Sequence, residues 1–381
     1  MIKSIFKRIE EKTAEYASLL ASLAEIESPT SHKAGVDAVG AFVADLAKAR
    51  GFDVVCHKEA VSGNAYAITM NKDAEGTLIC FSAHMDTVHP LGALKEMPVR
   101  IEDGKIYGPG VCDCKGGIAS SLLAMVALDE CGFTARPVRL ILQSDEETSS
   151  RQSEKRTVDF MCESAKGASL FLNCEPHRRS LVTTERKGIS RYELTVVGKA
   201  EHSAECYLGK NAILEASHKI IALEKLKDQS GITANCGVIK GGTAENTVAE
   251  KCVFTVDVRY ATRAQMEEAN AYVQRVADTS YIGGTSCSLV LKSSRIPMEW
   301  CERNETLLQK LNAVYEKHGI EKLTARSAGG GSDAAYITAS GVPCLDTFGV
   351  VGGGIHAKDE YAEIDSIALS AKMLALAAYC L

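Results

Sequence analysis

The chain has 381 residues, of which 46% are hydrophobic and 24% charged, a composition typical of a globular protein and not of a disordered, collagenous or coiled-coil one. An ordinary domain holds about 100–200 residues, so two domains are expected. The formal net charge is −6 and no long cluster of Lys or Arg occurs, which argues against nucleic acid as a partner.

The N-terminal segment, residues 1–28, mixes charged and apolar residues at helical spacing and predicts a helix. It lacks the apolar stretch and the cleavage site of a signal peptide, and no stretch is apolar over the roughly 18 residues of a membrane span. We therefore expect no membrane partner and a cytoplasmic location. The 14 Cys lack the spacing of a disulfide scaffold, and we interpret most of them as reduced core residues.

Helix and strand patterns alternate over the first half of the chain. Ser31 has the character of an N-cap for a periodic helix that runs through Ala49 and ends at Gly51. Strand-like runs follow, and Gly116-Gly117 opens a small-residue helix over about 117–130. In chain order, the strand-like runs are 53–56, 64–70, 77–83, 138–143 and 168–173.

The last three of these runs end in side chains that can carry chemistry. The run 77–83 leads into His84, the next into Asp145-Glu146-Glu147 and the last into Glu175. In open α/β sheets, ligands and catalytic groups gather at the carboxyl ends of the strands. The pattern therefore predicts one shared site.

The pattern of predicted helices and strands changes between residues 182 and 293, where the expected order of elements is β-α-β-β-α-β. This order is typical of a small α+β domain with an antiparallel sheet. We interpret 182–293 as a domain inserted into a catalytic domain formed by 1–181 and 294–381. The expected strands are 190–197, 232–239, 247–259, 285–292 and 342–348, and the expected helices are 211–226, 263–278, 304–318 and 365–380.

Several polar residues at these strand ends have both a chemical and a structural interpretation. Asp86 could orient a metal-binding His84, although His-x-Asp alone favours a structural histidine. Asp113, in a Gly-rich turn that opens a helix, could bind a ligand or cap the helix. Cys112 and Cys114 flank it, and we interpret both as packing residues, because side chains on either side of a central residue normally point away from it.

The run Asp145-Glu146-Glu147 is harder to explain structurally. Three consecutive carboxylates repel one another, so ending a buried strand with them is costly unless a cation or a shared proton offsets the repulsion. A solvated loop is the alternative. One of two adjacent Glu could bind a metal while the other takes a proton from water. No phosphate-binding loop, dinucleotide fingerprint or nucleophile elbow is present, which argues against a nucleotide enzyme.

Taken together, these motifs resemble the co-catalytic di-zinc metallopeptidases and deacylases, which include glutamate carboxypeptidase, acetylornithine deacetylase, succinyl-diaminopimelate desuccinylase, aminoacylase and peptidase T. The matching residues run from His84 to His356, over most of the chain. The resemblance implies an α/β protein with a zinc-peptidase-like α/β/α catalytic domain. It also implies that the insertion is a ferredoxin-like α+β domain that serves as a lid or for dimerisation.

The resemblance further implies two Zn²⁺ ions per subunit, with Co²⁺ or Mn²⁺ as possible substitutes. It assigns His84, Asp113 and Glu175 to one ion. Asp113 would bridge to the second ion, which Glu147 and His356 would also bind. These ligands, two imidazoles and hard carboxylates, suit zinc.

The remaining site residues follow from the same resemblance. Glu146 would be the general acid/base and Asp86 would orient His84. His202, in the insertion, matches a histidine that reaches a neighbouring subunit's active site and steadies the oxyanion, so a homodimer formed through the inserted domain is expected.

The substrate class also comes from the resemblance. The sequences of the matching segments are most similar to those of glutamate carboxypeptidases. Asn246 and Arg259 match substrate-contacting positions, with strand-end structural roles as the alternative, and Arg259 would pair with a carboxylate. The loop Gly329, Gly330 and Gly331 would direct backbone N–H groups at that carboxylate. We expect hydrolysis of a C-terminal amide bond in a small peptide, releasing an amino acid such as glutamate. An N-acyl-amino-acid deacylase or dipeptidase is the alternative, and a non-catalytic binding protein is a more distant one.

Overall fold

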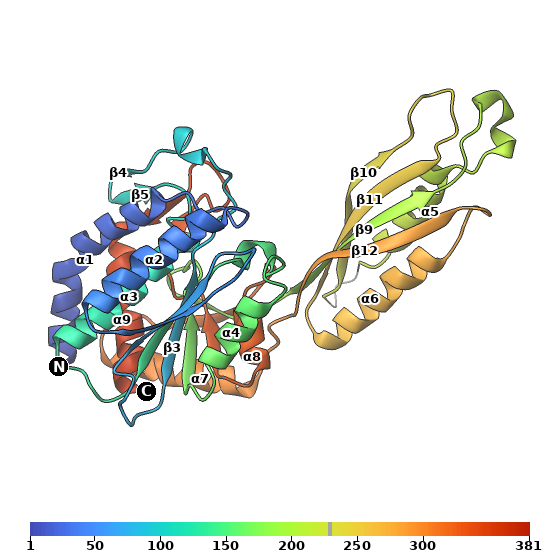
Figure 1. The fold of residues 1–381 in the computed structure, drawn as a ribbon. Coiled ribbons are helices and arrows are strands. Elements are labelled where there is room, and N and C mark those ends of the chain that lie inside the picture. The colour runs from blue at the N-terminus through green and yellow to red at the C-terminus, as the bar shows by residue number, and fades with distance from the viewer. Residues whose placement is uncertain (228–230) are drawn as a thin grey trace. The chain divides into compact units, whose positions relative to one another are not determined.

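The computed structural model describes residues 1–227 and 231–381, which form two compact units, each with its own hydrophobic core (Figure 1). Unit 1 comprises Met1–Thr184, Trp300–Ser327 and Tyr336–Leu381. Unit 2 comprises Glu185–Glu299 and Ala328–Ala335. The short segment 328–335 lies in unit 2 because its backbone oxygens accept hydrogen bonds from residues of that unit, as at Ala328, which accepts from the Lys187 N–H.

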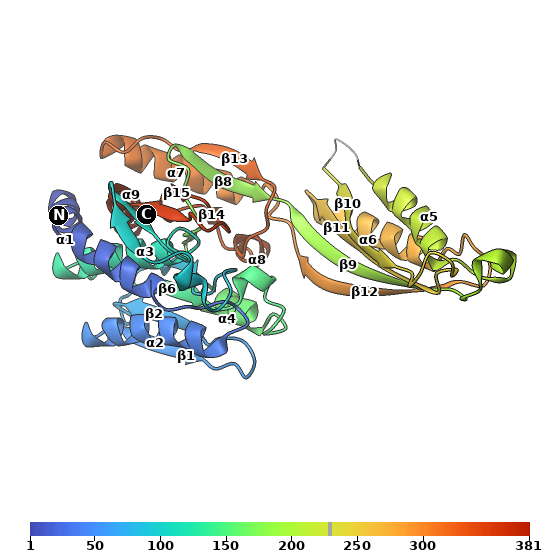
Figure 2. The ribbon, with the colours of Figure 1, turned by 90° about the horizontal axis from the view of Figure 1, so that it is seen from above.

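Unit 1 is built on a mixed eight-stranded sheet. Its strands are β1 (Asp53–His57), β2 (Ala65–Met70), β3 (Ile79–His84), β6 (Val138–Gln143), β7 (Leu170–Asn173), β8 (Leu181–Arg186), β13 (Thr324–Ala328) and β14 (Cys344–Asp346), in the order β1-β2-β6-β3-β7-β14-β8-β13 (Figure 2). The centre is parallel, since β3 runs parallel to both β6 and β7, and β7 to β14. Strands β2, β3 and β7 are buried at every residue, which explains their continuous apolar runs.

Helices cover both faces of this sheet. They are α1 (Ile2–Ala24), α2 (Lys33–Ala49), α3 (Lys115–Glu130), α4 (Arg156–Ser164), α7 (Glu302–Lys317), α8 (Ala334–Ala339) and α9 (Ile364–Cys380). Helices α1, α3 and α9 pack against one another, and α3 also lies against β3. Leu140 of β6 belongs to that core, whereas the neighbouring Arg139 donates a hydrogen bond to the Ser164 carbonyl at the end of α4. Since adjacent strand residues point to opposite faces, α4 covers the other side.

A smaller four-stranded sheet joins two loops of unit 1. It contains β4 (Arg100–Glu102), β5 (Lys105–Tyr107), β15 (Gly352–Gly353) and β16 (Tyr361–Glu363), in the order β15-β16-β5-β4. Tyr361 pairs with Tyr107 across the central strands. The loop after β5 and the loop between β15 and β16 are thereby joined, although they are far apart in the sequence.

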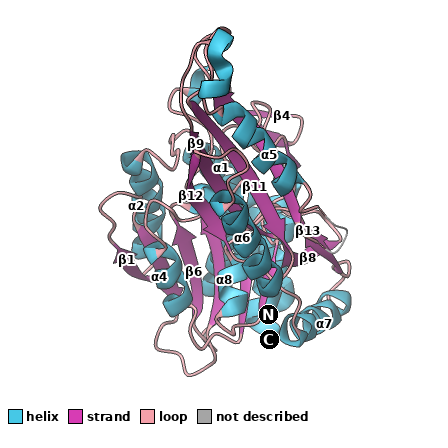
Figure 3. Ribbon diagram, turned by 90° about the vertical axis from the view of Figure 1, so that its right-hand side faces the viewer, coloured by secondary structure: helices cyan, strands magenta, loops and turns pink. Residues whose placement is uncertain are grey.

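Unit 2 contains a four-stranded antiparallel sheet, β10-β11-β9-β12, with two helices on one face (Figures 1 and 3). Alternate residues of the strands, such as Leu194 and Phe254, form a core with these helices. The predicted order β-α-β-β-α-β is observed. The elements are β9 (Gly188–Val197), α5 (Ala212–Glu224), β10 (Thr233–Gly241), β11 (Lys251–Tyr260), α6 (Arg263–Asp278) and β12 (Ser286–Arg295).

The predicted α/β class is confirmed, and three details need correction. The N-cap of helix α2 is His32 and not Ser31. The backbone N–H of Thr30 donates a hydrogen bond to the Thr87 carbonyl, which holds the chain outside the helix there, so the helix begins one residue later than predicted. Helix α3 begins at Lys115, before its two glycines. All 14 Cys are free, but only six are buried, so placing most of them in the core was wrong. Among residues 1–227 and 231–381, no helix is long and apolar enough to cross a membrane.

Candidate metal centre

His84 is the last residue of β3, and Asp86 fixes its ring. His84 Nδ1 lies 2.9 Å from the backbone oxygen of Asp86 and 3.3 Å from its Oδ1. A hydrogen bond at Nδ1 leaves Nε2 as the atom that faces a ligand. Nε2 is 3.0 Å from Asp113 Oδ1 and 3.9 Å from Glu175 Oε1.

The same Asp86 holds the turn that follows β6. Its Oδ1 accepts the Glu146 N–H at 3.2 Å and its Oδ2 accepts the Glu147 N–H at 3.1 Å. Thr30 donates its hydroxyl to Oδ2 at 2.7 Å. One fully buried carboxylate therefore positions both the β3 and the β6 ends of the site. Sequence reasoning identified its role toward His84 but missed both Thr30 and the backbone contacts.

A second buried carboxylate, Glu360, holds the loop that carries Asp113. Glu360 accepts hydrogen bonds from the N–H groups of Gly110, Cys112 and Asp113 at 2.9–3.1 Å, and from His89 Nε2 at 2.8 Å. Glu360 directly precedes β16, so the contact links the Asp113 loop to the loop that carries His356. No local signal in the sequence indicates this contact.

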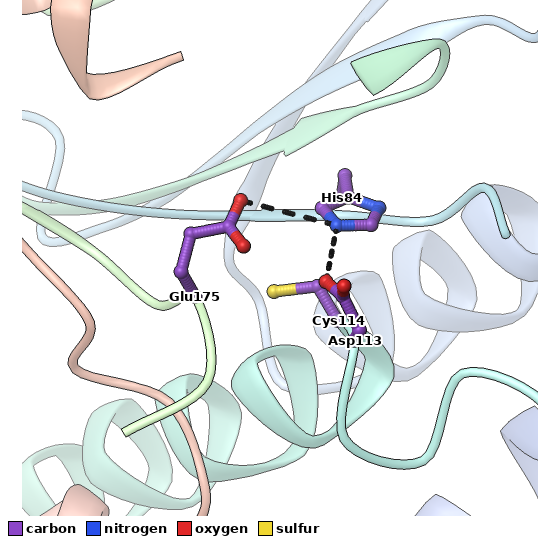
Figure 4. Close-up of side chains that lie close together, drawn as sticks. All are labelled: His84, Asp113, Cys114 and Glu175. Atoms are coloured by element: carbon purple, nitrogen blue, oxygen red, sulfur yellow. Dashed lines mark hydrogen bonds and ion pairs between the residues drawn. The ribbon is translucent and has the colours of Figure 1, made fainter. Parts of the chain in front are cut away.

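The predicted metal ligands come together in two groups that share Asp113. In the first group, each residue offers an atom within 4.8 Å of every other (Figure 4), and its members are His84, Asp113, Cys114 and Glu175. The second group meets the same limit and contains Asp113, Glu147 and His356. Its His356 Nε2 lies 3.4 Å from both Asp113 Oδ2 and Glu147 Oε2. Cys114, interpreted from the sequence as a packing residue, is the unexpected member.

Burial strongly perturbs the first group. Burial raises the pKa of Glu175 well above its usual value, and the charges of Asp113 and Glu146 raise it further. Burial alone would lower the pKa of His84, but the surrounding groups, with Cys114 the largest contributor, raise it well above the usual value. Such opposed shifts among buried neighbours are characteristic of functional sites.

The second group shows the same conflict between burial and charge. Burial raises the pKa of Glu147 to about 7, although a hydrogen bond with His356 opposes the rise. Hydrogen bonds with Asp113 and Glu147 raise the pKa of His356 to about 10. Burial would raise the pKa of Asp113 too, but its hydrogen bonds with His356 and His84 hold it below the usual value.

These residues fit a bound divalent cation. The Glu175 carboxylate is about nine-tenths buried, accepts no hydrogen bond from the described residues and faces His84 only at 3.9 Å. Leaving such a carboxylate uncompensated is costly. Carboxylate oxygens and imidazole nitrogens are donors that zinc and neighbouring transition metals accept. A cation among them would offset the repulsion that raises the pKa of Glu175.

The residues predicted to contact substrate lie in unit 2, at two separate places. His202 and Asn246 are neighbours near the start of β11: Ser203 N–H donates to the Asn246 carbonyl at 2.9 Å and His202 pairs with Thr247. His202 is exposed, and its Nδ1 accepts the Ala204 N–H at 3.2 Å.

Arg259 lies at the other end of β11, with the glycine loop. Its Nη1 donates to the Gly329 carbonyl at 2.7 Å and its Nε to Asp257 Oδ1 at 2.9 Å. Gly330 accepts a hydrogen bond from Arg186 at 3.2 Å, and a Cβ on Gly331 would lie 2.7 Å from Arg295 Cδ. The structure thus brings Arg259 and Gly329–Gly331 together, but not with His202 and Asn246.

Comparisons with known proteins extend these observations. The chain is 30% identical over 375 residues to carboxypeptidase G2 of Pseudomonas sp. (strain RS-16), covering 95% of this chain and 88% of that protein. It is 27% identical over 315 residues to succinyl-diaminopimelate desuccinylase of Rhodospirillum centenum, covering 78% of each. Among solved structures, the fold is similar to aminopeptidase PepT from Bacillus cereus, with a TM-score of 0.78, 20% identity and coverage of 96% of this chain and 97% of that one.

The α/β fold, the clustered donors and these relatives define a metal-dependent hydrolase of peptide or related amide bonds. The model of peptidase family M20/M25/M40 matches residues 80–379, and the chain belongs to this family. The resemblance drawn from the motifs is therefore confirmed.

Proposed function

We propose that the protein is a di-zinc carboxypeptidase that releases a C-terminal amino acid, with glutamate preferred. The observation that carries this proposal is the pair of donor groups that share Asp113. Glu146 directly precedes the donor Glu147 in the chain, and its charge raises the pKa of Glu175. The identity of 30% over 95% of the chain to a protein named carboxypeptidase G2 supports the choice of reaction. Each subunit would bind two Zn²⁺, for which Co²⁺ or Mn²⁺ could substitute.

Different residues of the chain would transfer the proton and position the groups around the scissile bond. Zinc ions, when bound, would supply Lewis-acid polarisation of the scissile carbonyl and activation of water. Glu146 would take a proton from the attacking water and return it to the leaving nitrogen. Asp86 positions this step, because its two oxygens hold the backbone of Glu146 and Glu147 while it orients His84.

Arg259 would bind the substrate carboxylate beside the Gly329–Gly331 loop. In the described residues, Asp257 and the Gly329 carbonyl engage two of its five donors, and its side chain is 33% exposed. A guanidinium with remaining donors can form two parallel hydrogen bonds with a carboxylate. We expect Arg259→Lys to raise KM for a glutamate-releasing substrate by about 10-fold, with a smaller effect on kcat.

Arg191→Lys is the matched control for that change. Arg191 lies opposite Asp257 on β9, and its Nε also contacts this carboxylate, at 2.9 Å. A similar rise in KM for both variants would mean that the Asp257 pairing, and not substrate binding, is responsible.

His202 and Asn246 would act in the active site of a second subunit. They lie at the opposite end of the ten-residue strand β11 from Arg259, a separation of roughly 30 Å at 3.3 Å per residue. One copy of unit 2 therefore cannot bring both ends to the same small substrate. We infer a homodimer formed through unit 2, in which each site takes Arg259 from one subunit and His202 from the other.

Mixing subunits tests this arrangement. His202→Ala and Glu146→Gln homodimers should each be nearly inactive, while a mixed dimer contains one site with an intact Glu146 and an intact His202. Partial recovery of activity on mixing is expected. His218→Ala, which removes another exposed histidine of unit 2, should remain active by itself. No recovery would contradict sharing of the site.

The substrate class is tested by amino-acid release from one panel of compounds. The panel contains folyl- and peptidyl-glutamates, dipeptides, and N-acetyl and N-succinyl amino acids, each with zinc-loaded and chelator-treated protein. Chelator-sensitive release of glutamate from the first compounds is the expected result. The identity of 27% to a desuccinylase favours an N-acyl-amino-acid deacylase as the second candidate, which cleavage of only the acyl compounds would establish.

A further inference from the structure

We propose that the Cys114 thiol is a fourth protein donor to the ion held by His84, Asp113 and Glu175. The inference rests on the proposed metal site and adds a soft sulfur ligand to one of its two positions. Cys114 also belongs to the hydrophobic core of unit 1, so this role would add to its packing.

The position of the sulfur carries the inference. Cys114 is fully buried, and its Sγ belongs to the group whose donor atoms all lie within 4.8 Å of one another. Figure 4 shows the sulfur directed toward Glu175, with His84 and Asp113 beside it. The thiol also donates a hydrogen bond to the Cys174 carbonyl, 2.9 Å from Sγ, and interacts with the backbone of His84. A thiol at this place is within reach of a cation that the other three residues bind.

Counting donors then distinguishes the two metal positions. With Cys114, the first group supplies four protein donors, which complete the tetrahedral shell that zinc prefers in closed sites. The second group supplies three, Asp113, Glu147 and His356, and so retains a position for water or substrate. The first ion would therefore be held more tightly, while exchange with substrate would occur at the second.

Sulfur also changes the metal preference of the first position. Binding breaks the S–H bond of Cys114, forms a sulfur–metal bond and releases the proton to solvent. A thiolate favours zinc, cadmium and cobalt over the harder ions manganese and magnesium. We expect the first position to prefer zinc, cadmium and cobalt over manganese and magnesium. The second position should show a weaker preference among these ions.

Cys112 provides a matched control in the same loop. It is fully buried as well, but its thiol is not in either donor group and lies beside Gly352. Its backbone N–H donates to Glu360, a contact that Cys112→Ser leaves in place. Both Cys112→Ser and Cys114→Ser replace a buried sulfur with oxygen. Only the sulfur of Cys114 belongs to a donor group.

Cobalt titration of the metal-free full-length protein is the first test. The first equivalent should produce a near-ultraviolet thiolate-to-cobalt charge-transfer band as well as the visible bands of bound cobalt. Cys114→Ser should lose the charge-transfer band and keep the visible bands, and Cys112→Ser should keep both. A wild-type protein with visible bands alone would overturn the role of Cys114, whereas no bound cobalt at all would overturn the metal site itself.

X-ray absorption of the zinc-loaded wild type provides a test that needs no variant. One sulfur at about 2.3 Å should accompany nitrogen and oxygen ligands at about 2.0–2.2 Å in the sample with one equivalent of zinc. A shell of nitrogen and oxygen alone would overturn the inference, while leaving the di-zinc proposal intact.

Discussion

The buried charges of Glu215 and Lys219 in unit 2 and of Glu175 in unit 1 differ in how they are compensated. In unit 2, Lys219 Nζ lies 3.0 Å from Glu215 Oε1 and also donates to the carbonyls of Val276 and Ala277. The other Glu215 oxygen accepts two backbone N–H groups. In unit 1, Glu175 accepts no hydrogen bond from the described residues, and its ion pair with His84 is long, at 3.9 Å. A buried charge that the chain satisfies indicates structure, whereas one left unsatisfied indicates a ligand site.

The largest expected effect concerns Glu146, which lies beside the unsatisfied cluster but is not one of its donors. Glu146→Gln should retain both metal ions and lower kcat by about 10²–10⁴-fold, because it removes the proton acceptor. Metal content and kcat are measured on the same preparation, with Glu163→Gln, an exposed carboxylate paired with Lys166, as the control. Undiminished turnover would remove Glu146 from the mechanism.

The cluster of Glu215 and Lys219, whose charges are compensated within the chain, should stabilise the fold and not bind metal. Lys219→Met leaves the Glu215 carboxylate buried without its ion pair, so we expect the free energy of unfolding to fall by about 3–5 kcal/mol. Urea denaturation with and without zinc measures this loss, and the exposed Lys225→Met serves as the control. If added zinc stabilised Lys219→Met by more than it stabilises the wild type, the two clusters would not differ as proposed.

The unsatisfied cluster should bind metal in competition with protons. His356 has a pKa of about 10 and Glu147 of about 7 in the metal-free protein, and both must be deprotonated to bind an ion. Below a pKa the proton is present and has to be displaced, so affinity rises with pH. For the ion bound by Asp113, Glu147 and His356, we expect affinity to rise about tenfold per pH unit above pH 7, where His356 is the one of these three ligands that still releases a proton, and more steeply below pH 7.

Calorimetry in buffers of different ionisation enthalpy counts these protons directly. Release of close to one proton near pH 8 by the ion at His356, and of more near pH 6, is expected. Binding that releases no proton at either pH would contradict the perturbed pKa values of His356 and Glu147.

The smallest effect is expected at Thr30, which supports the site through Asp86. Thr30→Val removes one hydrogen bond to Asp86 but leaves the contacts with His84 and with the backbone of Glu146 and Glu147. We expect kcat to fall by about fivefold, which corresponds to about 1 kcal/mol. Thr13→Val, which removes a hydroxyl bond within α1, controls for the loss of a hydroxyl group.

Much of the site could be predicted because its signals are local. A buried strand that ends in His or carboxylates can be recognised from a few residues, and β3, β6 and β7 are parallel neighbours, so their ends meet at one edge. The position of Asp113 beside His356 is not local. It depends on the β5–β16 pairing and on Glu360, which lies 247 positions after Asp113 in the chain. Only the resemblance to a family could place these two residues together.

Cys114 shows where sequence reasoning was incomplete. Alternation of side chains along an extended chain suggests that both neighbours of Asp113 point away from the site. The Asp113 loop is not an extended strand; three of its N–H groups converge on Glu360, and its next residues begin α3. Alternation therefore does not hold there, and of the two cysteines only Cys114 joins the donors.

The pairing of β16 with β5 also determines when the enzyme can first become active during synthesis. The Asp113 loop leaves the ribosome long before Glu360 and His356, which come from the last tenth of the chain. Until those residues have emerged, the nascent polypeptide lacks both the His356 side chain of the second metal group and the Glu360 carboxylate that holds the Asp113 loop. Hydrolytic activity is therefore expected only after the C-terminal tenth of the chain has been synthesised and β16 has paired with β5.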